Sequence, residues 1–279
     1  GRNLGTYWVR DLDRGRLGEL ITGHVFESSL KAPFSSKVEP MLEVSGLTRE
    51  GEYADVNLEL RPGEILGLIG RLGSGRTELA LSLFGMNPPD SGAIRVNGKP
   101  VQMHTNREAI RQKIAYVSED RLSLGLVMPQ TIADNTVISV LDRLTGPLGL
   151  IDSARRAQTI DRWIFQELHV KTNTADRPVQ QLSGGNQQRV VLSKWLATDP
   201  RVLILDSPTV GVDIGAKAGI FQVVDELAAR GLAILLISDE VEEVLYQSHR
   251  ILVMRSGQIV GTYDPQRVSE QELREVIYA

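Results

Sequence analysis

A glycine-rich octapeptide that follows an apolar run is the feature that most constrains the fold of this chain. Residues 70–77 are Gly-Arg-Leu-Gly-Ser-Gly-Arg-Thr, placed between a predicted buried strand and a helical pattern. Glycines let backbone N–H groups close round phosphate oxygens, and a helix N-terminus adds partial positive charge. Thr77 is placed to bind Mg²⁺, while Arg76 stands where the usual motif has lysine. The predicted phosphate-binding residues are Gly70, Gly73, Ser74, Gly75, Arg76 and Thr77.

Strand and helix patterns alternate from residue 41 onward, which is typical of a layered α/β domain. The predicted strands are residues 41–44, 54–60, 65–69, 93–96, 114–117, 202–205, 233–237 and 251–254. Between about residues 125 and 194 there is no strand pattern, and residues 131–144 and 153–170 are predicted helices. Ser153 is the expected N-cap of the second helix. The sequence thus predicts a helical insertion within an α/β core.

The beginning of the chain resembles its end. Residues 1–7 match residues 257–263, and further positions agree at the same offset as far as residue 21. Both copies have the pattern of a short strand followed by a small helix. Residues 26–40 contain Ser, Lys and Pro without periodicity, as linkers do. We therefore expect residues 1–40 to be the tail of a preceding domain plus a linker, and residues 41–279 to form one domain.

Composition excludes several classes of function. The chain has 31 Lys+Arg against 35 Asp+Glu and no basic block, which argues against nucleic acid as the main partner. With no cysteine, a disulfide scaffold, a thiolate metal site and cysteine catalysis are excluded. The apolar runs are far shorter than the roughly 18 residues of a membrane helix. His24, His104, His169 and His249 lack metal-ligand spacing, so we expect surface or packing roles.

Two further motifs have the chemistry of a nucleotide site. Leu-Ser-Gly-Gly-Asn-Gln-Gln, residues 182–188, begins a predicted helix, where small residues suit contact with phosphate. One nucleotide rarely needs two such loops, so this one is expected to face a nucleotide held by another domain. Its predicted contact residues are Ser183, Gly184, Gly185 and Gln187. Residues 202–205 are apolar and lead into Asp206, as a buried strand does when it delivers a carboxylate to Mg²⁺ or its water shell.

These motifs together resemble the ATP-binding cassette (ABC) proteins over residues 41–279. The resemblance implies an α/β P-loop NTPase fold with a RecA-like core, an antiparallel β subdomain and a helical subdomain over about residues 125–197. Finer details are similar to the sugar-importer branch (ribose, galactose, arabinose and xylose), whose ATP subunit carries two cassettes in one chain. They are the Gly-Arg-Thr at 75–77, Glu-Asp-Arg at 119–121, Ser-Gly-Gly-Asn-Gln-Gln at 183–188 and the run 211–217. The repeat then makes this chain the second, C-terminal cassette.

The same resemblance shows where catalytic residues are replaced. A hydrolytic cassette has a lysine on the phosphates, a glutamate after the strand aspartate and a histidine in the switch loop. This chain has Arg76, Ser207 and Asp239 at those places. Arginine still binds phosphate, but a serine hydroxyl is too weakly basic to be a general base, and Asp239 should repel the γ-phosphate. ATP binding at a degenerate site, with no intact catalytic set, is therefore implied; Glu240 is the alternative base.

Several assignments depend on the alignment with the family. Glu119 stands where the family often has glutamine, so Thr77, Glu119 and Asp206 form the implied Mg²⁺ set; a solvated loop acid is the alternative for Glu119. Tyr53 is expected to pack in the core rather than to stack on adenine. The apolar residues after the Glu-Asp-Arg run have two open interpretations, a docking place for a helix of the membrane subunit or core of the helical insert. They are Leu124, Leu126, Val127 and Met128.

The resemblance also implies partners and a location. The expected partners are the first cassette of the same longer chain, transmembrane permease subunits and, indirectly, a periplasmic sugar-binding protein. The expected place is the cytoplasmic face of the plasma membrane, where the assembled complex is an ATP-driven translocase and the isolated domain a weak or inactive ATPase. The alternatives are a soluble tandem-cassette ATPase of the translation or DNA-repair kind and a purely regulatory nucleotide-binding module. A GTPase would need an Asn-Lys-x-Asp guanine motif, which is absent, and a kinase would not need the LSGG motif.

Overall fold

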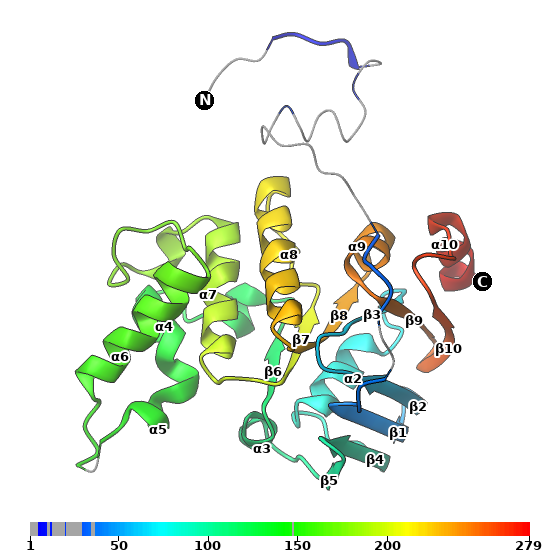
Figure 1. Ribbon diagram of the computed structural model, residues 1–279, viewed down its shortest axis with the longest axis horizontal. Helices are drawn as coiled ribbons and strands as arrows, with labels where there is room; N and C mark the ends of the chain where they lie inside the picture. Colours follow the sequence, from blue (N-terminus) through cyan, green and yellow to red (C-terminus); the bar gives the residue numbers. More distant parts are fainter. Residues whose placement is uncertain (1–4, 10–11, 13–19, 21–29, 35–36, 147) are drawn as a thin grey trace.

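The computed structural model of the chain describes residues 5–9, 12, 20, 30–34, 37–146 and 148–279. Most of the first copy of the predicted repeat, residues 1–23, and His24 lie outside the described residues. The described part combines two sheets with a group of helices at one side of the larger sheet (Figure 1). All eight predicted strands are confirmed; seven lie within two residues of the expected ends, and the one predicted at 41–44 continues to Arg49.

The larger sheet carries the phosphate loop near its centre. Its strand order is β10 (Gln258–Tyr263), β9 (Arg250–Arg255), β3 (Ile65–Gly70), β8 (Ala233–Ser238), β7 (Val202–Asp206) and β6 (Ile114–Val117). Five of these strands run parallel, and β10 pairs antiparallel with β9. Every residue of β3, β6, β7 and β8 is buried, as expected for strands covered on both faces.

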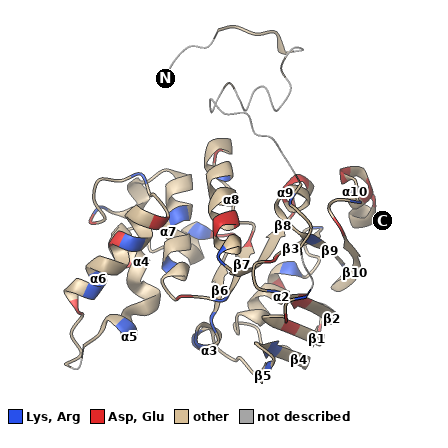
Figure 2. Cartoon of the chain, in the orientation of Figure 1, with Lys and Arg blue, Asp and Glu red and all other residues tan. Residues whose placement is uncertain are grey.

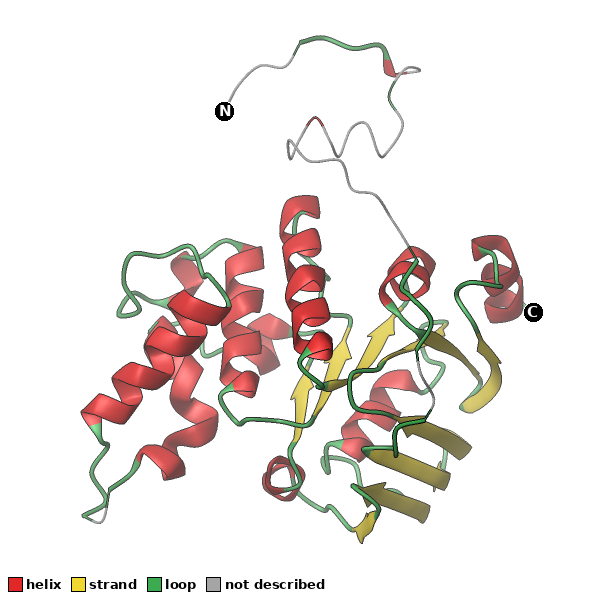
Figure 3. Ribbon diagram, viewed as in Figure 1, coloured by secondary structure: helices red, strands yellow, loops and turns green. Residues whose placement is uncertain are grey.

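The smaller sheet is antiparallel, with the order β2 (Tyr53–Leu60), β1 (Leu42–Arg49), β4 (Ser91–Val96) and β5 (Lys99–Val101). It packs beside α2 (Arg76–Leu83), the helix that follows the phosphate loop (Figure 3). Tyr53 is buried, and its hydroxyl lies 2.6 Å from the Ser82 hydroxyl. The packing role predicted for Tyr53 is therefore confirmed.

The helical insertion is more broken than its sequence pattern predicts. Its elements are α4 (Ile132–Val137), the 3₁₀ turn η3 (Ile138–Val140), α5 (Leu141–Leu144), α6 (Ser153–Ile160), the π-helical η4 (Asp161–Glu167), the 3₁₀ turn η5 (Val179–Gln181) and α7 (Gly184–Leu196). Continuous α-helices over 131–144 and 153–170 are thus wrong in detail. The predicted N-cap is also wrong, because the Asp152 carboxylate, one residue earlier, accepts from the N–H groups of Ala154 and Arg155.

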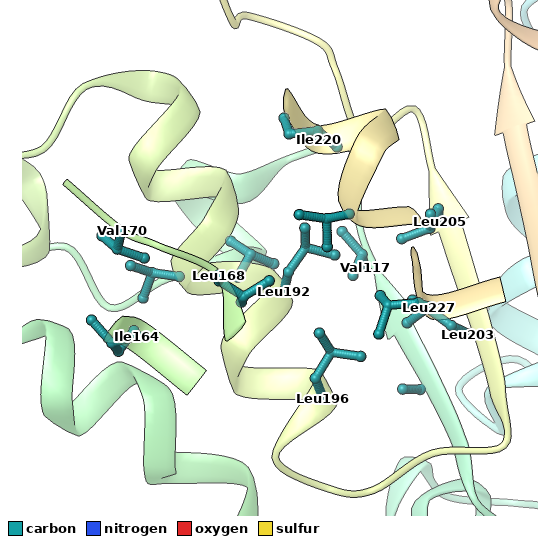
Figure 4. Close-up of a cluster of buried hydrophobic side chains, with 14 of the residues drawn as sticks. Val117, Ile164, Leu168, Val170, Leu192, Leu196, Leu203, Leu205, Ile220 and Leu227 are labelled. Carbon is teal, nitrogen blue, oxygen red and sulfur yellow. The ribbon is translucent and has the colours of Figure 1, made fainter. Parts of the chain in front are cut away.

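The helical insertion and the large sheet share one hydrophobic core. Figure 4 shows Leu192 and Leu196 of α7 lying between Leu168 on the insert side and Leu203 on the sheet side. The long helix α8 (Ile214–Ala229) closes the same core, with side chains from its buried face. The C-terminal half of α7 is therefore packed against the sheet that carries the phosphate loop.

The remaining described elements pack against the large sheet or against its helices. They are α3 (Asn106–Arg111), the π-helical η2 (Arg121–Gly125), α9 (Val241–Gln247) and α10 (Glu270–Tyr278). The second copy of the repeat forms β10 followed by α10, as predicted, and Ser269 caps α10 in a reciprocal bond with Glu272.

The turn between β9 and β10 joins the phosphate loop to the small sheet. Gly257 donates its N–H to the Ser74 carbonyl at 3.0 Å, and its own carbonyl accepts from Ala54 N–H at 2.9 Å. Its φ is +78°, and a Cβ there would lie 2.9 Å from the Glu52 carbonyl oxygen. Only glycine fits this junction without strain.

Basic and acidic side chains are mixed over most elements (Figure 2). Within the described residues, no helix has the length and apolar character needed to cross a bilayer.

Candidate functional site

The phosphate loop, the Glu-Asp-Arg run and Asp206 meet at the carboxyl ends of the parallel strands of the large sheet. Strands β3, β6, β7 and β8 are parallel, so their carboxyl ends lie together. The loops that leave these ends carry residues 70–77, Glu119, Asp206 with Ser207, and Asp239. Such an edge is the usual ligand-binding place of an open α/β sheet.

The phosphate loop needs its glycines for close approach. Gly73 and Gly75 have φ of +77° and +99°. A Cβ on Gly70 would lie 2.2 Å from the Met254 carbonyl oxygen, and one on Gly75 would lie 2.7 Å from the Glu52 carbonyl oxygen. Ser74 is buried within the loop. Over residues 70–75, backbone N–H groups are therefore what this loop offers to a phosphate.

Arg76 begins α2 and is turned into the protein. Its side chain is 8% exposed, and Nη1 donates to the Ser238 carbonyl at 2.5 Å. Burial lowers the pKa of Arg76, while the charges of Asp239, Asp206 and Glu119 act in the opposite direction. The guanidinium thus joins the phosphate loop to the loop after β8 and lies in a field of carboxylates.

Asp206 ends β7 in a polar pocket. It is 1% exposed, and its carboxylate accepts from the Tyr116 hydroxyl at 3.0 Å and from the Thr77 hydroxyl. Burial raises the pKa of Asp206, and these hydrogen bonds oppose that shift. Thr77, Glu119 and Asp206 all line one open pocket of about 470 Å³. One hydroxyl and two carboxylates are oxygen donors of the kind that Mg²⁺ takes beside substrate phosphates, so the three residues fit such an ion.

No strong base occupies the place after Asp206. Ser207 is 7% exposed, has φ of +46°, and its N–H donates to the Ile237 carbonyl at 2.9 Å. Asp239 is exposed at the end of β8. The alternative base, Glu240, is paired with Lys217 at 2.7 Å.

Sequence reasoning missed a buried acid behind this site. Glu243 is 4% exposed and accepts from the Ser238 hydroxyl at 2.6 Å, from the Thr209 hydroxyl and from Lys217 Nζ at 2.6 Å. Burial opposes the charge of Lys217, but its bonds to Glu240 and Glu243 raise its pKa above the ordinary value. In the sequence, Glu243 is one of several acids in residues 239–243, and nothing there distinguishes it as buried.

The Leu-Ser-Gly-Gly motif forms the start of α7. Asn186 donates to the Ser183 hydroxyl at 2.9 Å, and the buried Gln187 side chain donates to the Leu182 carbonyl at 3.1 Å. A Cβ on Gly184 would lie 2.9 Å from the Gly211 carbonyl oxygen, and one on Gly185 would lie 2.3 Å from the Ala216 Cβ. Both glycines therefore permit close packing against residues 211–216.

The apolar residues after the Glu-Asp-Arg run divide between the two predicted roles. Leu124 is 71% exposed and Val127 is exposed as well, whereas Leu126 is buried and Met128 packs against the core. The first pair can meet a partner, and the second pair belongs to the insert.

The described histidines lie apart from this edge of the sheet. His104 and His169 are exposed. His249 is half-buried, accepts from the Ile65 N–H at 2.9 Å and packs against Phe34 with ring centroids 5.3 Å apart. Among the described residues, no cluster of three or more His, Cys, Asp or Glu side chains is placed to hold a metal ion.

Comparison with known proteins agrees with this arrangement. Residues 53–210 match the family model described as "ABC transporter". The chain is 43% identical, over 94% of its length, to the ribose import ATP-binding protein RbsA 2 of Rubrobacter xylanophilus. It is 41% identical, over 84% of its length, to a putative ribose/galactose/methyl galactoside import ATP-binding protein of Agrobacterium fabrum. It spans 50% and 46% of these two proteins, about half of each.

Solved structures share the fold. The ADP conformation of MJ1267, an ATP-binding cassette of an ABC transporter, superposes with a TM-score of 0.71 at 22% identity, over 86% of this chain and 96% of that one. The post-hydrolysis dimer of the cassette MJ0796, bound to ADP and Pi, has a TM-score of 0.68 at 20% identity, over 81% and 99%. The α/β core, the antiparallel β sheet, the helical subdomain and the matched sequence together show that this chain belongs to the ABC transporter ATP-binding family.

Proposed function

We propose that this chain is the second cassette of the ATP subunit of an ABC importer for monosaccharides. The names of its relatives, which are ribose and galactose import proteins twice as long, support the substrate class and a second cassette in the same polypeptide. Residues 1–40 would be the tail of the first cassette plus the linker, and residues 41–279 the second. The further partners are permease subunits and, through them, a periplasmic sugar-binding protein, on the cytoplasmic face of the plasma membrane.

The phosphate loop would hold ATP·Mg²⁺ in a degenerate site. Gly70, Gly73, Ser74, Gly75 and Arg76 would contact phosphate, with Thr77, Glu119 and Asp206 holding the ion. When bound, Mg²⁺ would neutralise phosphate charge. Arg76 would bind a phosphate oxygen if it leaves the Ser238 carbonyl, and its fork then offers two donors. Ser207 cannot take a proton from water at neutral pH, and the Asp239 charge opposes the γ-phosphate, so slow turnover follows.

The signature loop would complete the ATP site of the partner cassette. The observation that carries this proposal is that the two motifs are separated. The pocket beside Thr77 and Asp206 is lined by residues of the phosphate loop, of 116–124 and of 206–211. None of the described residues in that lining belongs to 183–188. Ser183, Gly184 and Gly185 would face the other nucleotide, while Gln187, engaged with Leu182, would support the loop. Nucleotide bound between the two cassettes would draw them together and so drive sugar uptake.

The test uses the 279-residue chain and three variants. We expect MgATP binding together with turnover below about 0.01 s⁻¹, against ~1 s⁻¹ or more for typical enzymes. Arg76→Ala should abolish binding, and Ser207→Glu alone should raise turnover by less than about tenfold because Asp239 still opposes the γ-phosphate. Arg95→Ala, on an exposed position of β4, is the matched control and should behave like the parent chain.

Two results would overturn the proposal. One is turnover near ~1 s⁻¹ that Arg76→Ala removes, since the site would then be catalytically complete. The other is co-purification of the longer native protein with ribosomes rather than with membranes, which would favour a soluble tandem-cassette ATPase.

A further inference from the structure

One arginine contacts both the helix that begins with the signature residues and the loop that follows Thr209. Arg121 Nη1 donates to the Val210 carbonyl at 2.6 Å, and Nη2 donates to the Gly211 carbonyl at 2.9 Å. Its Nε lies 3.5 Å from the Gln187 side-chain oxygen in α7. The guanidinium therefore reaches residues 210–213, which we name the D-loop, and the helix that begins with the signature residues.

The guanidinium lies where these two loops meet. A Cβ on Gly184 would be 3.1 Å from Arg121 Nη2, and a Cβ on Gly211 would be 3.2 Å from Nη1. The backbone at Gly184 also approaches the Gly211 carbonyl, which itself accepts from Nη2. One planar group thus fills the space beside both glycines and satisfies two adjacent carbonyls.

The same segment lines the nucleotide pocket, to which Arg121, Val210 and Gly211 also contribute. Glu119 lines the pocket together with Thr77 and Asp206. Between Glu119 and Arg121, the Asp120 carboxylate accepts from the N–H groups of Leu122 and Ser123 at 3.1 Å and 3.0 Å. The backbone from Glu119 to Arg121 is therefore held in a single short turn.

We propose that Arg121 is a positioning residue that passes a displacement at Glu119 to the D-loop and to the signature loop. The proposal rests on the proposed function, because it gives the reason why both loops should respond to nucleotide in this chain's own pocket. Arginine is required by geometry. Its rigid fork matches two neighbouring carbonyl oxygens, whereas a lysine ammonium is a single point on a flexible stem.

The test is amide hydrogen exchange of the 279-residue chain, with and without MgADP, in the parent, Arg121→Ala, Arg121→Lys and Arg143→Ala. Arg143 is the matched control because its Nη1 also donates to a backbone carbonyl, that of Thr198 at 3.0 Å, away from the site. Without nucleotide, the Val210 and Val212 amides should exchange about tenfold faster in both Arg121 variants, at a melting temperature close to that of the control. With MgADP, all chains should show slower exchange over residues 70–77, but only the parent and Arg143→Ala should show it over 183–188 and 210–213.

Each outcome decides one question. If the Arg121 variants keep the nucleotide response of both loops, or if their D-loop exchange without nucleotide equals that of the parent, the inference is wrong. If Arg121→Lys behaves like the parent, the fork argument fails and with it the assigned role. If residues 70–77 do not respond to MgADP in any chain, nucleotide binding itself is refuted, and the exchange rates without nucleotide still decide the contact role of Arg121.

Discussion

The close contact between Gly185 and Ala216 makes a strong test of the packing behind the signature motif. An alanine at 185 would place its Cβ 2.3 Å from the Ala216 Cβ, well inside van der Waals contact. Residue 185 lies within α7 and has no positive φ, so the backbone accepts alanine and only the contact opposes it. Helix propensity alone would favour alanine over glycine by about 1 kcal/mol. Overpacking of a close-packed interior costs about 1–3 kcal/mol and more when backbone must move.

We therefore expect Gly185→Ala to lower the free energy of unfolding by about 1–2 kcal/mol, because the steric cost exceeds the propensity gain. Ala216→Gly should cost up to about 1 kcal/mol through helix propensity in α8. In the double variant the colliding methyl group of Ala216 is gone. Its loss of unfolding free energy should therefore be smaller than the sum of the two single-variant losses by at least about 1 kcal/mol. Urea denaturation of the four chains measures this cycle.

Additivity would refute the reasoning. Independent sites add within about 0.5 kcal/mol, so a coupling energy of that size or less would mean that α7 and α8 separate without cost at this point. A Gly185→Ala chain as stable as the parent would have the same meaning.

Three other expectations follow from the site and its surroundings. Burial and the Lys31 charge lower the pKa of His249 below its ordinary 6.5, so the unfolded chain takes up the proton first as pH falls. The free energy of unfolding should therefore decrease as pH drops from 6.5 through the native pKa. Urea midpoints at about pH 7.5 and about pH 5 measure this decrease, and His249→Gln should make it smaller. Glu243→Ala leaves the Ser238 and Thr209 hydroxyls without their acceptor and leaves the partly buried Lys217 ammonium paired with Glu240 alone, so it should cost about 3 kcal/mol. Lys217→Met should restore part of this loss, as a double-variant cycle of thermal unfolding would show. Tyr116→Phe removes a hydrogen bond that opposes the raised pKa of Asp206, so MgADP binding should weaken by less than about tenfold. A titration of nucleotide affinity against pH should also show that binding is lost at a higher pH than in the parent chain.

The edge of the sheet was predictable because its signals are local. An apolar run followed by a turn defines each strand and its end, and parallel order then brings residues 70–77, Glu119 and Asp206 together. Contacts set by tertiary packing carry no such signal. The Arg121 guanidinium binds the carbonyls of Val210 and Gly211, about 90 residues further along the chain. Nothing in the sequence at these three positions indicates the contact.

Helix boundaries in the insert failed for a related reason. Apolar spacing gives the face that packs, and residues 131–144 and 153–170 keep that spacing through the change of helix type. The 3₁₀ turn at Ile138–Val140 and the π-helix at Asp161–Glu167 depend on how that face meets the core, which Ile164 and Leu168 enter fully. The cap at Asp152 was missed because Asp and Ser are both good N-cap residues. Which of the neighbours Asp152 and Ser153 caps the helix depends on where the backbone turns from extended to helical, and the sequence does not give that position.

The Gly257 junction has a consequence for the order in which the chain folds. The phosphate loop receives its bond to Ser74 from a turn close to the C-terminus, and the small sheet is tied to the same peptide. A contact between residues so far apart in the sequence forms slowly compared with the local turn between β9 and β10. During synthesis, residues 70–77 would therefore emerge long before the hairpin of β9 and β10 that completes their surroundings. A chain that stops at the end of β9 would contain every residue of the phosphate loop and still lack Gly257, whose bonds hold it.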